Sequence, residues 1–196
     1  EYLVAAYYNS KNYDAAYRAI KQMDNPDNNI KSALQKISYF RALELYNNGD
    51  YDGAEALLEE SLENSYNAKY TALAGFWQGE LLMREGRYDA AAAKFRRYLQ
   101  LAPKSEPEYE MSYYNLGYAL LEAGNRTQAR AQFDNFLWLH QQKDVYRADA
   151  LNRKGDILYA QRSFDKAIEA YNQSAAIASP ERDYALYQRA VVLGLN

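Results

Sequence analysis

The sequence contains no cysteine and a single histidine, His140, among its 196 residues. Without cysteine the chain can form no disulfide, no thiolate metal site and no cysteine nucleophile, and one histidine cannot supply the several imidazoles of a zinc site. No glycine-rich phosphate loop is present either. We expect His140 to be a partly exposed imidazole near a helix end, and we predict no enzyme activity, no cofactor and no metal.

An excess of basic residues and long apolar runs are also missing. Lys and Arg number 23 against 26 Asp and Glu, which gives a net charge of −3 and no overall positive field for nucleic acid or anionic lipid. No segment resembles a membrane span or a signal peptide. We therefore expect neither nucleic-acid binding nor direct membrane insertion. Because the chain begins at Glu1 without a methionine, we interpret it as a fragment of a longer protein.

Residues that favour strands or break helices are scarce. Only 12 residues are Val, Ile or Thr, against 31 alanines, and the chain has nine glycines and four prolines. This balance favours helix over sheet, and 48% hydrophobic residues suffice to bury a core. The composition predicts an all-α protein.

Alanine recurs at an almost constant interval along the whole chain. Ala16, Ala54, Ala91, Ala129 and Ala167 are separated by 38, 37, 38 and 38 residues. Twelve residues before each alanine, the position is filled by Val4, Ala42, Gly79, Gly117 or Gly155. Each period reads as two amphipathic helices joined by a tight turn, with close helix contact at these two columns. Gly49, Gly86 and Gly124 mark three of the turns because glycine accepts a positive φ.

The C-terminal segment predicts one further helix. Asp183 to Leu195 repeats the pattern of Ala148 to Ala160, and we interpret it as the first helix of a sixth repeat whose partner helix is not in the sequence. Its apolar side, formed by Leu186, Ala190 and Leu193, is expected to be uncovered. Weak self-association through this helix is therefore a possible outcome.

These columns resemble the tetratricopeptide repeat. In the fourth period Tyr113, Leu116, Gly117, Leu120, Ala129 and Phe133 fall on the family's W-x2-L-G-x2-Y…A-x3-F pattern. Periods three and five resemble the pattern through Gly79, Leu82, Ala91, Phe95 and Pro103, and through Gly155, Leu158, Ala167 and Tyr171. The longer period is similar to that of bacterial cell-envelope scaffold proteins, which favours the periplasm or cell envelope over the cytoplasm.

The resemblance implies a fold, a domain organisation and a function. The expected fold is an all-α, right-handed superhelical solenoid of antiparallel helix pairs, with about five repeats plus one unpaired helix, and residues 1–196 are expected to form a single solenoid domain. It also implies binding of a protein or peptide along a concave groove. No repeated basic pair supports a carboxylate clamp there.

Aromatic and polar residues recur at the first-helix positions that the family directs into its groove. We expect these positions to form a solvent-accessible stripe, because tyrosine, with 21 copies, suits contact surfaces. The predicted partner-binding residues are Tyr8, Tyr39, Tyr46, Asn47, Phe76, Arg84, Tyr114, Tyr118, Asn152 and Tyr159.

Three alternatives remain open at this stage. Any of these rings could instead pack between neighbouring helices as core. Stacked tyrosines with Asn and Asp could hold sugar rings, as in a glycan-binding module of a bacterial outer-membrane receptor system. The chain could also be a structural spacer within a larger protein.

Overall fold

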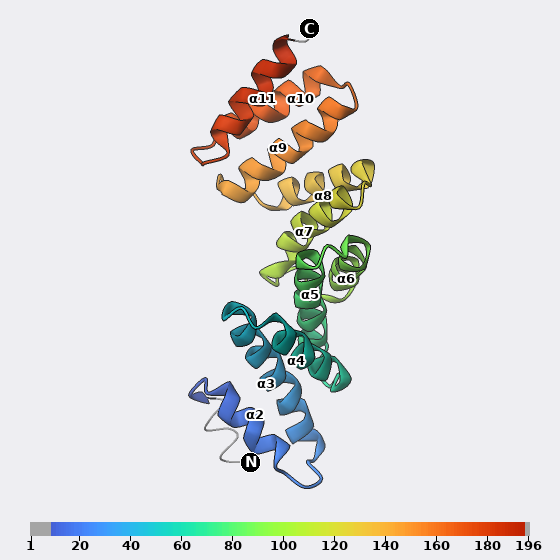
Figure 1. Cartoon of the computed structure of the whole chain (residues 1–196), viewed down its shortest axis with the longest axis vertical. Coiled ribbons are helices and arrows are strands. Elements are labelled where there is room, and N and C mark those ends of the chain that lie inside the picture. Colours follow the sequence, from blue (N-terminus) through green and yellow to red (C-terminus); the bar gives the residue numbers. More distant parts are fainter. Residues whose placement is uncertain (1–8, 195–196) are drawn as a thin grey trace. The chain divides into compact units, whose positions relative to one another are not determined.

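The structure, a computed structural model, describes residues 9–194, so the predicted groove residue Tyr8 lies outside the described residues. Within that range the chain is all-α, as the sequence predicts, and contains no strand. It divides into two compact units, Glu1–Pro103 and Lys104–Asn196. The helices (Figure 1) are α2 (Tyr13–Lys21), α3 (Asn28–Asn47), α4 (Tyr51–Glu63), α5 (Ala68–Arg84), α6 (Tyr88–Leu101), α7 (Glu108–Glu122), α8 (Arg126–Leu139), α9 (Val145–Ala160), α10 (Phe164–Ala175) and α11 (Arg182–Gly194).

Four helix pairs make up most of the two units. α3 pairs with α4 and α5 with α6 in the first unit, and α7 pairs with α8 and α9 with α10 in the second. Three residues connect the two helices of each pair: 48–50, 85–87, 123–125 and 161–163. Such short connections fold the second helix back along the first, which confirms the expected antiparallel pairs.

The turn within each pair contains one residue in the left-handed region. Gly49, Gly86 and Gly124 have φ of 82°, 73° and 82°, and Arg162 takes the equivalent place with φ 58°. In the first turn Gly49 N donates to Tyr46 O at 3.0 Å and Asp50 N to Leu45 O at 2.9 Å. These bonds satisfy the last carbonyls of the helix, which explains why a residue that tolerates positive φ recurs here.

The small residue of the first helix and the alanine of the second lie where the two helices meet. The alanines are fully buried, as are the aromatic side chains four residues later in periods three to five, Phe95, Phe133 and Tyr171. These rings lie against the glycines Gly79, Gly117 and Gly155, where a Cβ atom would come within 2.5–2.9 Å of a ring carbon. The glycines are therefore required by close approach of the ring.

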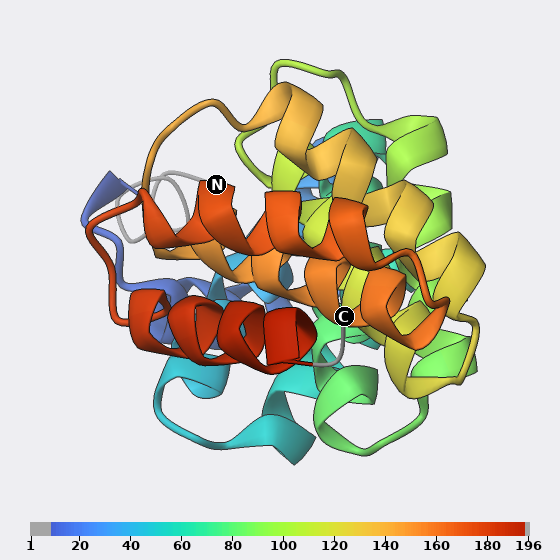
Figure 2. The same cartoon turned by 90° about the horizontal axis from the view of Figure 1, so that it is seen from above.

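Helix α11 packs on α10 in the second unit (Figure 1), and Figure 2 shows the two helices side by side. Ala185 and Val192 of α11 are buried in a cluster with Leu158, Ala167 and Tyr171. Leu186 is partly exposed, Ala190 is exposed and Leu193 is 55% exposed, so much of the predicted apolar side is uncovered. None of the described helices combines the length and apolar character that crossing a bilayer requires.

Candidate functional site

The first helix of each pair supplies the face on which partner binding was predicted. In each unit we call the side formed by these helices its first-helix face: α3 and α5 in the first unit, and α7, α9 and α11 in the second. Three of the predicted contact residues are buried: Tyr39 is 4% exposed, Phe76 is 5% exposed and Asn152 is fully buried. The expectation that these three side chains are solvent-accessible is therefore wrong.

The reason is that this column of the repeat points between helices. The Phe76 ring packs on Phe95 and Tyr98 of its own second helix, with centroid distances of 5.6 and 5.3 Å. Tyr39 lies 5.4 Å from Tyr70 of the next first helix. Asn152 Nδ2 donates to the carbonyl of Glu181 at 3.1 Å, which ties α9 to the start of α11. Aromatic rings and an amide here stabilise the stacking of helices.

Other predicted residues lie together at the ends of α3 and α5. Asn47 and Arg84 are exposed, and Tyr46 is half-buried. The Tyr46 ring packs edge-on against Tyr51 at 5.4 Å and Trp77 at 5.1 Å. The Arg84 guanidinium lies 3.8 Å from the centroid of Tyr51, a cation–π contact. We call Tyr46, Tyr51, Trp77 and Arg84 the aromatic–arginine cluster.

The aromatic–arginine cluster carries one polar group without a partner. Trp77 Nε1 is buried and forms no hydrogen bond within the described part of the chain. Burial, with the charge of Glu80, raises the pKa of the Tyr46 hydroxyl, while Arg84 acts in the opposite direction. That hydroxyl therefore stays protonated at neutral pH. Tyr51 was not predicted as a site residue because only columns within the first helix were considered, and Trp77 was missed because its column of α5 was not among them.

In the second unit, Tyr114 and Tyr118 are half-buried and share one carboxylate. Both hydroxyls donate to Asp149 Oδ2, that of Tyr114 at 2.8 Å. Their rings pack against Phe133, at 6.2 and 5.4 Å, so they also line the interior of their own helix pair. Burial and the Asp149 carboxylate raise the pKa of both tyrosines. They act as fixed hydrogen-bond donors between α7 and α9.

The same arrangement occurs around Asp156, seven residues further along α9. The hydroxyls of Tyr171 and Tyr184 donate to Asp156 Oδ1 at 2.8 and 2.9 Å. Between the two carboxylates lies Arg153, whose Nη1 is 2.8 Å from Asp156 Oδ2 and whose Nε is 3.5 Å from Asp149 Oδ1. We call these seven residues the tyrosine–aspartate network.

Sequence reasoning missed Asp149 and Arg153, although their spacing was a usable signal. Asp149, Arg153 and Asp156 are spaced four and three residues apart, which places them on one side of a helix. The remaining predicted residue on α9, Tyr159, is half-buried beside Phe164 at 5.9 Å. More exposed rings on the same helices are Tyr146 at 46% and Tyr187 at 66%.

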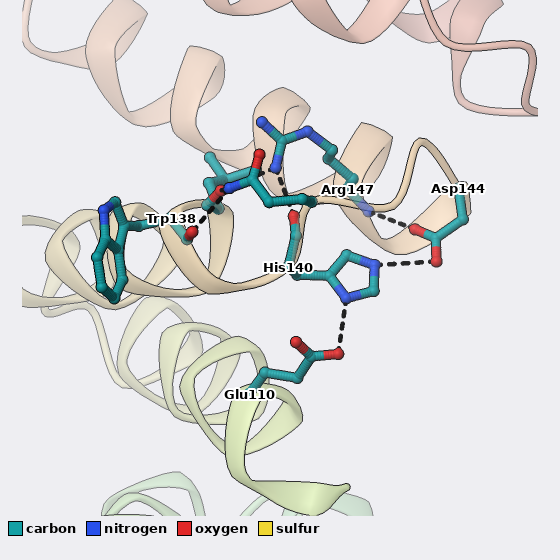
Figure 3. Close-up of polar contacts among 7 residues, drawn as sticks. Glu110, Trp138, His140, Asp144 and Arg147 are labelled. Carbon is teal, nitrogen blue, oxygen red and sulfur yellow. Dashed lines mark hydrogen bonds and ion pairs between the residues drawn. The ribbon is translucent and has the colours of Figure 1, made fainter. Parts of the chain in front are cut away.

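The sequence predicts a partly exposed His140, but in the structure this residue is buried, with 5% of its surface exposed. Figure 3 shows its ring between two carboxylates: Nδ1 lies 2.8 Å from Glu110 Oε1, and Nε2 lies 2.9 Å from Asp144 Oδ2. An imidazolium can donate to both carboxylates, whereas each neutral tautomer can donate to one. The expectation failed because the ring stacks on Phe136, with centroids 4.8 Å apart, and bonds to Glu110, which lies 30 residues away on α7.

The connection after α8 is held by further bonds around His140 (Figure 3). Arg147 Nη1 donates to the carbonyls of His140 and, at 2.8 Å, Leu137, while Asp144 Oδ1 accepts from the Arg147 amide at 3.0 Å. Trp138 points away from this cluster and is 78% exposed. Since both ring nitrogens of His140 are engaged by carboxylates, its arrangement is that of a structural tie. Among the described residues no group of His, Asp and Glu has the geometry to hold a metal ion.

Comparison with known proteins supports the repeat pattern and its fold. The tetratricopeptide repeat family matches residues 39–106 and 114–183, more than half of the chain. No curated protein matches the sequence. Among solved structures, BtubC (BKLC) from P. vanneervenii has a TM-score of 0.70 at 18% identity, over 98% of this chain and 82% of that one.

Two further structures are similar at comparable identity. PilF of Pseudomonas aeruginosa has a TM-score of 0.63 at 19% identity and covers 98% of this chain and 81% of its own. MamA from Desulfovibrio magneticus RS-1 has a TM-score of 0.63 at 18% identity, over 83% of this chain and 94% of its own. At these identities the likeness establishes the fold alone. The periodic alanines, the helix pairs and the family match agree, and the chain belongs to the tetratricopeptide repeat family.

Proposed function

We propose that this chain is a non-catalytic scaffold that binds an extended or helical segment of a partner protein on the first-helix face of its first unit. Tetratricopeptide repeat proteins generally mediate protein–protein interaction. The observation that carries the proposal is the aromatic–arginine cluster, in which Tyr46 and Trp77 offer ring surface next to the exposed Arg84 and Asn47. Aromatic rings and arginine are the side chains that contribute most to binding free energy at protein interfaces.

The chemistry of the cluster suits a polypeptide segment. Arg84 can donate to backbone carbonyls or to a carboxylate, and Asn47 can both donate and accept. The rings contact one another edge-on, so they are positioned before a partner arrives and little rotamer entropy is lost on binding. The buried Tyr39 and Phe76 would support this surface indirectly by fixing the helices that carry it.

Selection of peptides from a displayed random library tests the proposal. The protein should enrich a related set of peptides, and Asn47→Ala combined with Arg84→Ala should weaken the binding of a selected peptide about tenfold or more, equivalent to about 1.4 kcal/mol. Both residues are exposed, so the melting temperature should change little. Binding constants would be measured by isothermal titration calorimetry.

Arg87→Ala provides the matched control, because Arg87 is an exposed arginine three residues from Arg84 whose one side-chain partner among residues 9–194 is Glu85, at 3.1 Å. Its peptide affinity should stay within about twofold of the original protein, well under 1 kcal/mol. If no peptides are enriched, or if the Asn47 and Arg84 substitutions leave their affinity unchanged, the proposal is wrong. Saturable binding to a glycan array without peptide binding would favour the glycan-binding alternative.

A further inference from the structure

A cavity opens on the side of the second unit formed by its second helices. It lies above α9 between α8 and α10 and has a volume of about 300 Å³. Its floor is apolar, since Leu151, Leu158 and Ala170 are each at most 3% exposed. Polar side chains line the rest of the cavity: Arg130, Asp134, Lys154, Lys166, Glu169 and Gln173.

The charges around this cavity do not cancel. Lys154 Nζ pairs with Asp134 Oδ1 at 2.7 Å, and Glu169 Oε1 accepts from Gln173 at 3.2 Å. Arg130 and Lys166 form no ion pair or hydrogen bond within residues 9–194. Arg130 is half-buried, where an unpaired guanidinium costs more free energy than at an exposed site. The lining thus holds three cations against two carboxylates, and neither Arg130 nor Lys166 pairs with a carboxylate within the described residues.

The repeat architecture does not require this basic lining. In the first unit the equivalent seam runs over α5 between α4 and α6, and the repeat register gives its residues directly. Glu55 stands in the place of Arg130, Gln78 in that of Lys154, and Ala90 in that of Lys166. These three positions are thus acidic or neutral in the first unit and basic in the second, whereas Gln173 of the second unit corresponds to Arg97 of the first. The helices stack in both units, so their packing does not require these cations.

We propose that this cavity binds an anionic oxygen group, a carboxylate or phosphate carried on a short apolar stem. Arginine and lysine donate charge-assisted hydrogen bonds to such groups, and the planar guanidinium of Arg130 matches two oxygens at once. The buried leucines and Ala170 offer contact to the stem. A volume of about 300 Å³ lies at the lower end of the range for ligand sites, which suits a small group. The proposal is independent of the function of the first-helix face.

Titration with glutarate and with inorganic phosphate tests the proposal. Binding is measured by the change in amide chemical shifts and by calorimetry. We expect saturable shifts at Leu151 and Ala170 on the cavity floor. Arg130→Gln combined with Lys166→Gln should weaken binding at least tenfold while the melting temperature stays the same. A capped tripeptide with a central glutamate distinguishes the two sources of the anionic group, a side chain of another protein and a free small anion. If it binds more tightly than glutarate, the ligand is an acidic side chain of another protein, and in the reverse case it is a free anion.

A charge-matched variant separates specific binding from general attraction. Arg126→Gln combined with Lys143→Gln removes the same two charges from exposed positions of the second unit that do not line this cavity. Binding by this control variant should equal that of the original protein. The proposal is overturned if neither anion nor the peptide gives saturable shifts at the cavity floor. It is also overturned if both variants lose affinity equally.

Discussion

Asp149 and Asp156 lie seven residues apart on α9 and use their oxygens in the same way. Each carboxylate accepts two tyrosine hydroxyls on one oxygen and faces Arg153 with the other. Burial raises the pKa of Asp156, although Arg153 and the two hydroxyls act in the opposite direction. Four tyrosines from α7, α10 and α11 thus converge on one helix. We infer that the tyrosine–aspartate network holds these helices together.

Substitution of Tyr114 and Tyr118 separates this structural contribution from partner binding. Replacing both by alanine removes half-buried rings that pack on Phe133, so we expect the free energy of unfolding to fall by about 2 kcal/mol or more per ring. Replacing both by phenylalanine keeps the rings but removes the hydrogen bonds to Asp149, at an expected cost of about 1–3 kcal/mol for the pair. Urea denaturation measures both.

The two variants also distinguish the alternatives for these tyrosines. If the alanine pair unfolds at the same urea concentration as the original protein, the rings contribute nothing to the core and are free for a partner. A loss in the alanine pair that far exceeds the loss in the phenylalanine pair would identify ring packing as the larger contribution.

Asp144 should make the free energy of unfolding of the second unit depend on pH in the acid range. Partial burial opposes its ionisation, but hydrogen bonds from the backbone of Arg147 and from His140 outweigh that effect, and the pKa of Asp144 is below the usual 3.8. The folded state therefore binds this proton less readily than the unfolded state. The contribution of Asp144 is complete above the usual aspartate pKa and decreases as the pH falls through the lowered value.

We therefore expect Asp144→Asn to reduce the free energy of unfolding by about 1 kcal/mol at pH 7, and by less as the pH falls below about 4. Asparagine still caps the helix, so the lost charge is the main change. Denaturant unfolding between pH 7 and pH 3 measures this difference. Asp165→Asn is the control, because Asp165 is exposed and makes no hydrogen bond or ion pair within residues 9–194. A difference that stays constant with pH would contradict the assignment.

The turn residue Arg162 should tolerate, and benefit from, replacement by glycine. It has φ 58° where the three preceding turns have glycine, and a side chain in this region costs about 1–2 kcal/mol. Arg162→Gly should therefore raise the free energy of unfolding by up to about 1 kcal/mol, and Gly124→Ala should lower it by about 1 kcal/mol. Nothing lies within 4 Å of a Cβ at Gly124, so backbone strain alone would be measured.

Gln161→Gly is the control for this turn, since Gln161 has φ −84° and gains nothing from glycine. It should destabilise the protein by about 0.5–1 kcal/mol. If Arg162→Gly is as destabilising as Gln161→Gly in thermal or urea unfolding, the side chain of Arg162 makes a contribution that outweighs its strained backbone.

The sequence predicted the repeats well because their determinants are local or strictly periodic. The buried alanines, the glycines under Phe95, Phe133 and Tyr171, and the glycine turns all follow from one column each. Positions on the first-helix face were harder to predict. Whether Phe76 or Tyr46 is buried depends on the size of side chains on two neighbouring helices, although their two repeat columns are both predicted to face the groove.

The polar contacts were missed for a different reason. His140 bonds to Glu110 of another helix, and Asp149 accepts from tyrosines 31 and 35 residues away. Such pairs depend on how the helices stack, which no spacing within a single helix records. Where acceptor and donors lie on one helix, as for Arg153 with Asp149 and Asp156, the spacing did contain the information.

Gly75 and Gly79 lie one turn apart on α5 and should respond to alanine in opposite directions. Neither has a positive φ, so alanine suits the backbone at both positions and would by itself stabilise the helix by about 0.5–1 kcal/mol. At Gly75 nothing lies within 4 Å of the added Cβ, and that gain should be observed. At Gly79 the Cβ would lie 2.7 Å from Cε1 of Phe95, a ring that is fully buried and cannot move aside. Gly79→Ala should therefore destabilise the first unit by about 1–3 kcal/mol. Equal stabilisation by both substitutions, measured by urea unfolding, would show that α5 and α6 can separate without cost and that the small-residue column is not a packing requirement.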